Sequence, residues 1–204
     1  MSKNSWQQLT IMVIVALLNG VLGAMSALIP IVMAAHKSTM LIGSYSFTMA
    51  LMGVLVSLGA AFGSMFGQQL FRNVSAFAMT ITAGILSFLT TLSSIIAHIY
   101  AILPFFFLLA ATASIASIKL TQWLVNTVEH KILASTMGLL NTFAMASAPV
   151  MTTIFTTISG ISDVRYALIA LLAVEAMVVF VAVRLSVKVK RSQTEAETVI
   201  KVSE

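Results

Sequence analysis

The chain has 204 residues, of which 59% are hydrophobic and 8% are charged, and its formal net charge is +5. Its mean hydropathy of +1.04 excludes a soluble globular protein, because such a protein must cover its surface with polar groups. Its basic residues lie in loops and in the tail rather than on one face, which argues against nucleic-acid binding, and it contains no cysteine for disulfides or thiolate chemistry. We therefore expect an integral protein of the lipid bilayer.

Six apolar segments follow one another along the chain, and each is long enough to cross a hydrocarbon core of about 30 Å. The first has no small-residue cleavage site after a short apolar core, so it is expected to remain as a transmembrane helix. The pattern predicts an all-α polytopic domain over residues 1–187. The charged residues 188–204 have too little apolar surface to fold alone, and are expected to form a disordered tail. The predicted spans are approximately 9–34, 42–67, 75–96, 99–122, 133–159 and 164–186.

The distribution of basic residues predicts the orientation in the membrane. If the N-terminus is cytoplasmic, only Lys37 and Arg165 of the eleven lysines and arginines fall outside. This bias follows the positive-inside rule, so both termini are expected in the cytoplasm and the protein in the plasma membrane. The residues on the inner side are Lys3, Arg72, Lys119, Lys131, Arg184, Lys188, Lys190, Arg191 and Lys201.

Small residues in the second span predict helix packing. The segment "GAAFGSMFG" places Gly59, Gly63 and Gly67 four residues apart, on one face of a helix. In lipid, helices associate through close backbone contact, which small residues allow. The alternative, a surface that slides during a transport cycle, stays open.

Polar residues within the spans are the candidates for a substrate cavity. They are Asn19 in the first span, Thr112, Ser117 and Lys119 in the fourth, and Asn141 in the fifth. Intramembrane polar groups either bond to neighbouring helices or line a solvated space. Two alternatives stay open: hydroxyl groups can bond to their own helix, and Lys119 lies close enough to the inner interface to snorkel.

Enzyme chemistry is not expected. His36, His98 and His130 fall in three different loops, two outside and one inside, so they cannot share a metal ion. The chain has no glycine-rich phosphate loop followed by lysine, and no serine, base and acid fall at one depth. We expect no cofactor and no metal.

Two segments resemble the C-terminal half of a major facilitator superfamily transporter, in the branch of macrolide-efflux proteins and the enterobactin exporter. "LTIMVIVALLNGVLGAMSALIPIVM" is similar to the seventh helix of that family, and "NTVEHKILASTMGLLNTFAMASAPV" to its loop and eleventh helix. The chain departs from the family at Glu129, where the family has proline, and at Ala134-Ser135, where it has Gly-Arg. The resemblance extends over all six helices. The residues in matching places are Val128, Asn141, Thr142 and Pro149.

The resemblance implies a half-transporter. A facilitator-type site lies between two halves near the midplane, so a second copy or a separate N-terminal half would complete it. The implied substrate is a small amphiphilic compound, exported with proton coupling. The altered loop favours an alternative, a non-transporting membrane protein that is either a truncated remnant or an accessory, immunity-type subunit.

Glu175 is a charge in the middle of the last span, within "YALIALLAVEAMVVFVAVRL". A carboxylate at the bilayer centre costs about 3 kcal/mol on the insertion scale. The resemblance implies that this helix lies at the periphery, away from the cavity, and a helical wheel groups Glu175 with Leu168, Leu172 and Val179 on a bulky apolar side. Its role stays open between proton coupling, a contact with another subunit or a missing half, and a tolerated residue that is protonated or snorkels.

Overall fold

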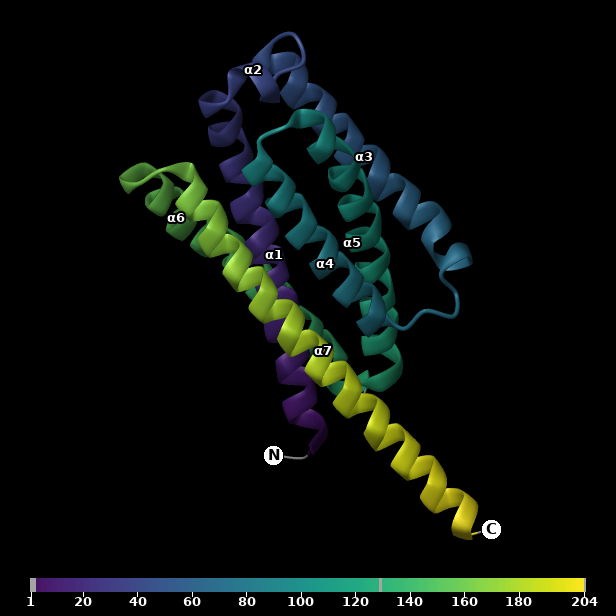
Figure 1. Ribbon diagram of the computed structural model, residues 1–204. Helices are drawn as coiled ribbons and strands as arrows, with labels where there is room; N and C mark the ends of the chain where they lie inside the picture. Colours follow the sequence, from purple (N-terminus) through teal and green to yellow (C-terminus); the bar gives the residue numbers. More distant parts are fainter. Residues whose placement is uncertain (1–2, 129, 204) are drawn as a thin grey trace.

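The computed structural model describes the backbone of residues 3–128 and 130–203, and the side chains of residues 13–128, 131–184 and 186–187. Every regular element in these residues is a helix (Figure 1). Six of them are long and apolar enough to cross a membrane, which confirms the predicted all-α fold of six spans. The elements are α1 (Lys3–Ala35), α2 (Lys37–Met40), α3 (Tyr45–Leu70), α4 (Ala76–Ile96), α5 (Ile99–Thr127), α6 (His130–Ile161) and α7 (Val164–Ser203).

Two details of the elements differ from the sequence-based expectation. The connection after the first span contains the short helix α2, and α7 continues through the charged segment 188–203, where the composition favoured disorder. The amide of Met40 donates to the carbonyl of His36 over 2.9 Å, which closes the single turn of α2.

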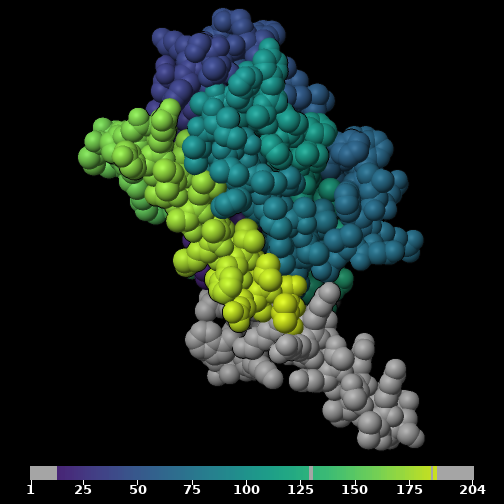
Figure 2. Space-filling view, viewed as in Figure 1, coloured from purple at the N-terminus to yellow at the C-terminus, as the bar shows by residue number. Residues whose placement is uncertain are grey.

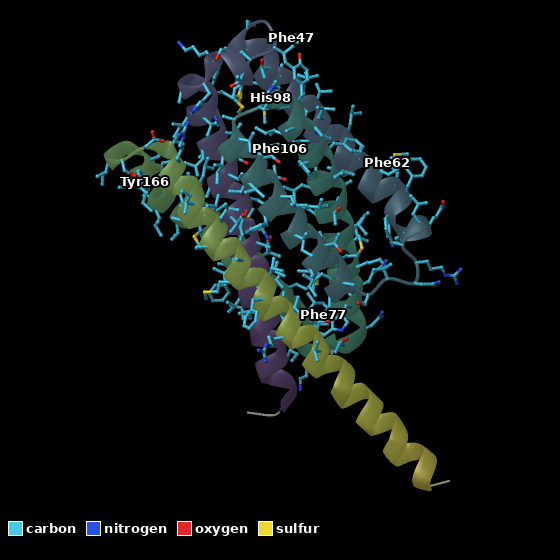
Figure 3. All side chains as sticks on the ribbon, in the orientation of Figure 1. Phe47, Phe62, Phe77, His98, Phe106 and Tyr166 are labelled. Carbon is cyan, nitrogen blue, oxygen red and sulfur yellow. The ribbon has the colours of Figure 1, made fainter. Side chains whose placement is uncertain are left out.

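The long helices pack in pairs. α1 lies along α6, α3 lies along α5, and α4 lies between α5 and α7. α7 also packs against α1 and α6, whereas α5 and α6 hardly touch each other. α3 therefore forms one edge of the bundle, where the ring of its Phe62 (Figure 3) lies 6.2 Å from the ring of Phe107 on α5.

The bundle has two different ends. α1 begins and α7 ends at the same end, here called the termini end, and α2 lies at the other, here called the α2 end (Figure 1). Phe77 lies toward the termini end, whereas Phe47, His98 and Tyr166 lie toward the α2 end (Figure 3). The largest buried apolar cluster joins parts of α1, α2, α5 and α7 that lie toward the α2 end, including Leu28, Met33, Met40, Ile102 and Leu168. The α2 end is therefore closed by a packed core.

The glycines of α3 allow a close contact between α3 and α5. Gly59, Gly63 and Gly67 are buried against α5. A Cβ atom added at Gly63 would collide with the carbonyl oxygen of Ala111, and one at Gly59 with the carbonyl oxygen of Phe107. The two backbones thus approach to a distance that only glycine permits.

Thr48 anchors the connection between α2 and α3. Its hydroxyl is buried, accepts the amide hydrogen of Ile42 over 2.8 Å, and lies 3.0 Å from the carbonyl oxygen of Ser44 as a donor. We expect Thr48→Val to lower the free energy of unfolding by about 1–3 kcal/mol, because the amide of Ile42 loses its acceptor. Unfolding in mixed micelles with increasing sodium dodecyl sulfate would measure the change.

The matched control is Thr39→Val, because Thr39 is exposed and its hydroxyl makes only a 3.4 Å contact with the carbonyl of His36. Equal stability losses in the two variants would contradict the anchoring role of Thr48.

Candidate substrate cavity and buried carboxyl

A cavity of about 590 Å³ lies among α1, α4, α5 and α6. It occupies the space left between α5 and α6, which hardly touch. Its wall on α1 is formed by residues 15–22, at the middle of that helix, and its wall on α6 by residues 137–144, in the half of that helix nearer the termini end. The lining residues on α4 and α5 include Thr80, Ala83, Ser87, Leu109, Ala113, Ala116, Ser117, Leu120, Thr121 and Leu124.

Three of the five residues predicted for a cavity line this one. Asn19 contributes from α1, Ser117 from α5 and Asn141 from α6. All three side chains are exposed within the single chain, and the amide nitrogen of Asn19 donates to the carbonyl of Val15 over 3.0 Å. The helix pairing thus brings together polar groups that are 24 to 122 positions apart in the sequence.

The other two predicted residues lie outside the lining. Thr112 donates its hydroxyl hydrogen to the carbonyl of Leu108 on its own helix, over 2.7 Å. The ammonium group of Lys119 donates to the carbonyl of Val74, over 2.7 Å, and so ties α5 to the connection between α3 and α4. The rotation of about 100° per residue explains both cases, because it places Thr112 and Lys119 on a different side of α5 from the lining residues.

Polar lining residues of α4 and α5 were missed. Thr80, Ser87 and Thr121 line the cavity, but the sequence analysis did not select them. Five of the eight residues at positions 87–94 carry hydroxyl groups, and all five are buried. This density of hydroxyls in an apolar span is the signal that could have identified Ser87, and with it the polar surroundings of Glu175.

Glu175 is enclosed within its own chain. Its side chain is 1% exposed, and its Oε1 atom accepts hydrogen bonds from Ser87 over 2.7 Å and from Thr91 over 2.9 Å. Its Oε2 atom is buried without a hydrogen-bond partner. In the space-filling view the side chains of α7 lie directly against those of α4 (Figure 2).

This enclosure changes the interpretation of Glu175. The apolar wheel face suggested a side chain turned to the periphery, but that face packs on α4, whose hydroxyls supply the missing polar partners. A carboxyl with 1% exposure has no surface left to contact a second subunit, and it does not reach the interface as a snorkelling residue.

Ser87 is part of both the cavity and the surroundings of the buried Glu175 carboxyl. It lines the cavity, and its hydroxyl donates to Glu175. Ser87, which is itself only 1% exposed, therefore lies between the cavity and the buried carboxyl.

None of the described residues that line this cavity comes from α7. Comparison with protein-family models, with curated proteins and with solved structures finds no match to this chain.

Proposed function

We propose that this protein is half of a facilitator-like membrane transporter, which exports a small amphiphilic compound and is driven by a proton gradient. The observation that carries the proposal is the cavity of about 590 Å³, whose wall unites Asn19, Ser117 and Asn141 from three helices. Its volume lies in the range of small-molecule sites, about 300–1,000 Å³.

The chemistry of the wall favours an amphiphile. Most of the lining is apolar, with leucine, valine and alanine side chains such as Leu18, Leu22 and Leu109. The few amides and hydroxyls among them provide hydrogen bonds that orient a ligand. A compound with an apolar body and a small polar group satisfies both kinds of surface.

The exposed amides support the need for a second half. Asn19 and Asn141 lie within membrane-spanning segments and are exposed in the single chain. Polar groups at this depth require water or protein rather than acyl chains around them. A second copy of the chain, or a separate N-terminal half, would cover this face and complete the cavity between two halves.

The position of the cavity supports export. It lies toward the termini end, while the core around Leu28, Met40 and Ile102 closes the α2 end. With the termini in the cytoplasm, as the positive-inside bias predicts, the cavity collects its ligand from the cytoplasmic side.

The test uses the amphiphilic dye rhodamine 6G as the probe, in cells that express the chain. We expect Asn19→Leu and Asn141→Leu each to lower the initial efflux rate about tenfold, because each removes one hydrogen-bonding group from the cavity wall. The control is Thr142→Val, since Thr142 is exposed beside Asn141 on α6 but bonds to Gly138 and does not line the cavity. Unchanged efflux in both asparagine variants would contradict the assignment of the cavity.

The alternative is an accessory, non-transporting membrane protein, which the departures at Glu129 and Ala134-Ser135 favour. The mass of the particle in nanodiscs, after expression of this chain alone, separates the cases. A particle of two copies supports a self-paired transporter. A single copy without dye efflux, even when a facilitator-type N-terminal half is supplied, supports the accessory protein.

A further inference from the structure

The carboxyl of Glu175 has no ionised partner among the described residues. The helices packed against α7 are α1, α4 and α6. Among their described side chains, at positions 13–35, 76–96 and 131–161, the one ionisable group is Lys131, which is exposed in the first turn of α6. On α7 itself the nearest charges, Arg165 and Arg184, lie ten and nine residues away, or about 15 and 14 Å along the helix axis. The groups that face the carboxyl are the hydroxyls of Ser87 and Thr91.

The surroundings satisfy the two protonation states unequally. As a carboxylate, Glu175 accepts hydrogen bonds from Ser87 and Thr91 at Oε1, while Oε2 is left without a donor and the charge without a counter-ion. As an acid the group is neutral, and its own proton needs an acceptor. Thr91 can provide that acceptor, because its hydroxyl hydrogen has a second place to point, the sulfur of Met25 at 3.4 Å.

We propose that the carboxyl of Glu175 is a proton-binding site, and that Ser87 is the positioning residue that connects it to the cavity. A fluctuation that opens Ser87, 1% exposed at rest, to the cavity lets a hydronium ion give a proton to its Oγ atom, while Ser87 gives its own hydroxyl proton to Oε1 of Glu175. The carboxylate becomes a carboxylic acid, and the serine is chemically unchanged. The reverse transfer releases the proton to the cavity.

The link to the cavity makes proton binding sensitive to the ligand. Ser87 lies in the wall, so a compound seated against it displaces the water that delivers or removes the proton. This part of the inference rests on the proposed transport function, whereas proton binding itself does not.

Infrared spectroscopy of the protein in nanodiscs tests the proton site without any substrate. We expect a carboxylic-acid C=O band at neutral pH that disappears reversibly as the pH is raised and is absent in Glu175→Gln. Asp163→Asn is the control, because Asp163 is an exposed loop carboxyl, and it should keep the band. Ser87→Ala should shift the band, since one hydrogen bond to the carboxyl is lost, and slow its response to a pH jump by about tenfold or more.

If Glu175→Gln does not fold, isotope labelling of the wild-type protein tests the assignment of the infrared band to a glutamate. With ¹³C-labelled glutamate the band must move, whereas labelled aspartate must leave it in place. A wild-type protein with no such band at any pH, or a band unaffected by glutamate labelling, would overturn the proposal.

Reconstituted vesicles separate this inference from the proposed function. With rhodamine 6G on both sides, an imposed pH gradient should accelerate dye exchange in the wild type but not in Glu175→Gln. Equal acceleration in the wild type and the variant would overturn the coupling role of Glu175. A wild-type protein that neither exchanges nor accumulates the dye would instead contradict the transport function, and the infrared result would stand by itself.

Discussion

Replacement of Gly63 by leucine is expected to lower the free energy of unfolding by about 3 kcal/mol. The clash would be with the backbone of α5 at Ala111, which has no rotamer by which to escape. Since α3 packs mainly against α5, separation of this pair removes the principal tertiary support of α3. Unfolding in mixed micelles of increasing sodium dodecyl sulfate content measures the loss.

Gly53→Leu is the matched control on the same helix. Nothing lies within 4 Å of a Cβ atom at Gly53, and the position is exposed, so leucine there should leave stability unchanged or slightly raise it through its better helix propensity. If the two variants were equally stable, α3 and α5 would not be held by the close contact at Gly63.

The second large effect concerns two alanines, of which Ala113 lines the cavity and Ala167 is buried in the packed core. We expect Ala113→Phe to fold like the wild type but to reduce rhodamine 6G efflux at least about tenfold, because the ring occupies the cavity. Ala167→Phe should instead destabilise the protein by about 1–3 kcal/mol or more, because Ala167 is 0% exposed in the packed core and the added ring has no space there.

Thermal unfolding in detergent and the initial efflux rate, measured on both variants, distinguish the two sites. Ala113→Phe with normal stability and normal efflux would show that the cavity is not on the transport route. Loss of stability in Ala113→Phe equal to that in Ala167→Phe would show that the space around Ala113 is filled.

Hydroxyl groups show why part of the site was not predictable. Ser87 and Thr91 appear in the sequence as two of many hydroxyls that could bond to their own helix, as Thr112 does. Their partner Glu175 is 88 and 84 positions away, so the bonds exist only because α4 and α7 lie side by side. The sequence close to Ser87 and Thr91 does not indicate that Glu175 is their partner.

Lys119 is a second residue whose hydrogen-bond partner could not be predicted from the sequence. Its depth near the end of a span was readable from the sequence, but not the direction of its side chain, which bonds to Val74 in a connection 45 positions earlier. Asn19 and Asn141 were selected because a buried amide has several hydrogen-bonding sites to satisfy, and this reason is independent of which helices are neighbours.

The sequence by itself determined the six membrane-spanning helices and the small-residue face of α3, because span length, hydropathy and a four-residue repeat are local properties of the chain. The tertiary structure alone decided which polar residues share a cavity and which side of α7 is buried. Both depend on which helices become neighbours. In lipid the apolar faces of all the helices are nearly equivalent. Only close packing and buried polar pairs, such as Ser87 with Glu175, therefore distinguish one arrangement of the helices from another.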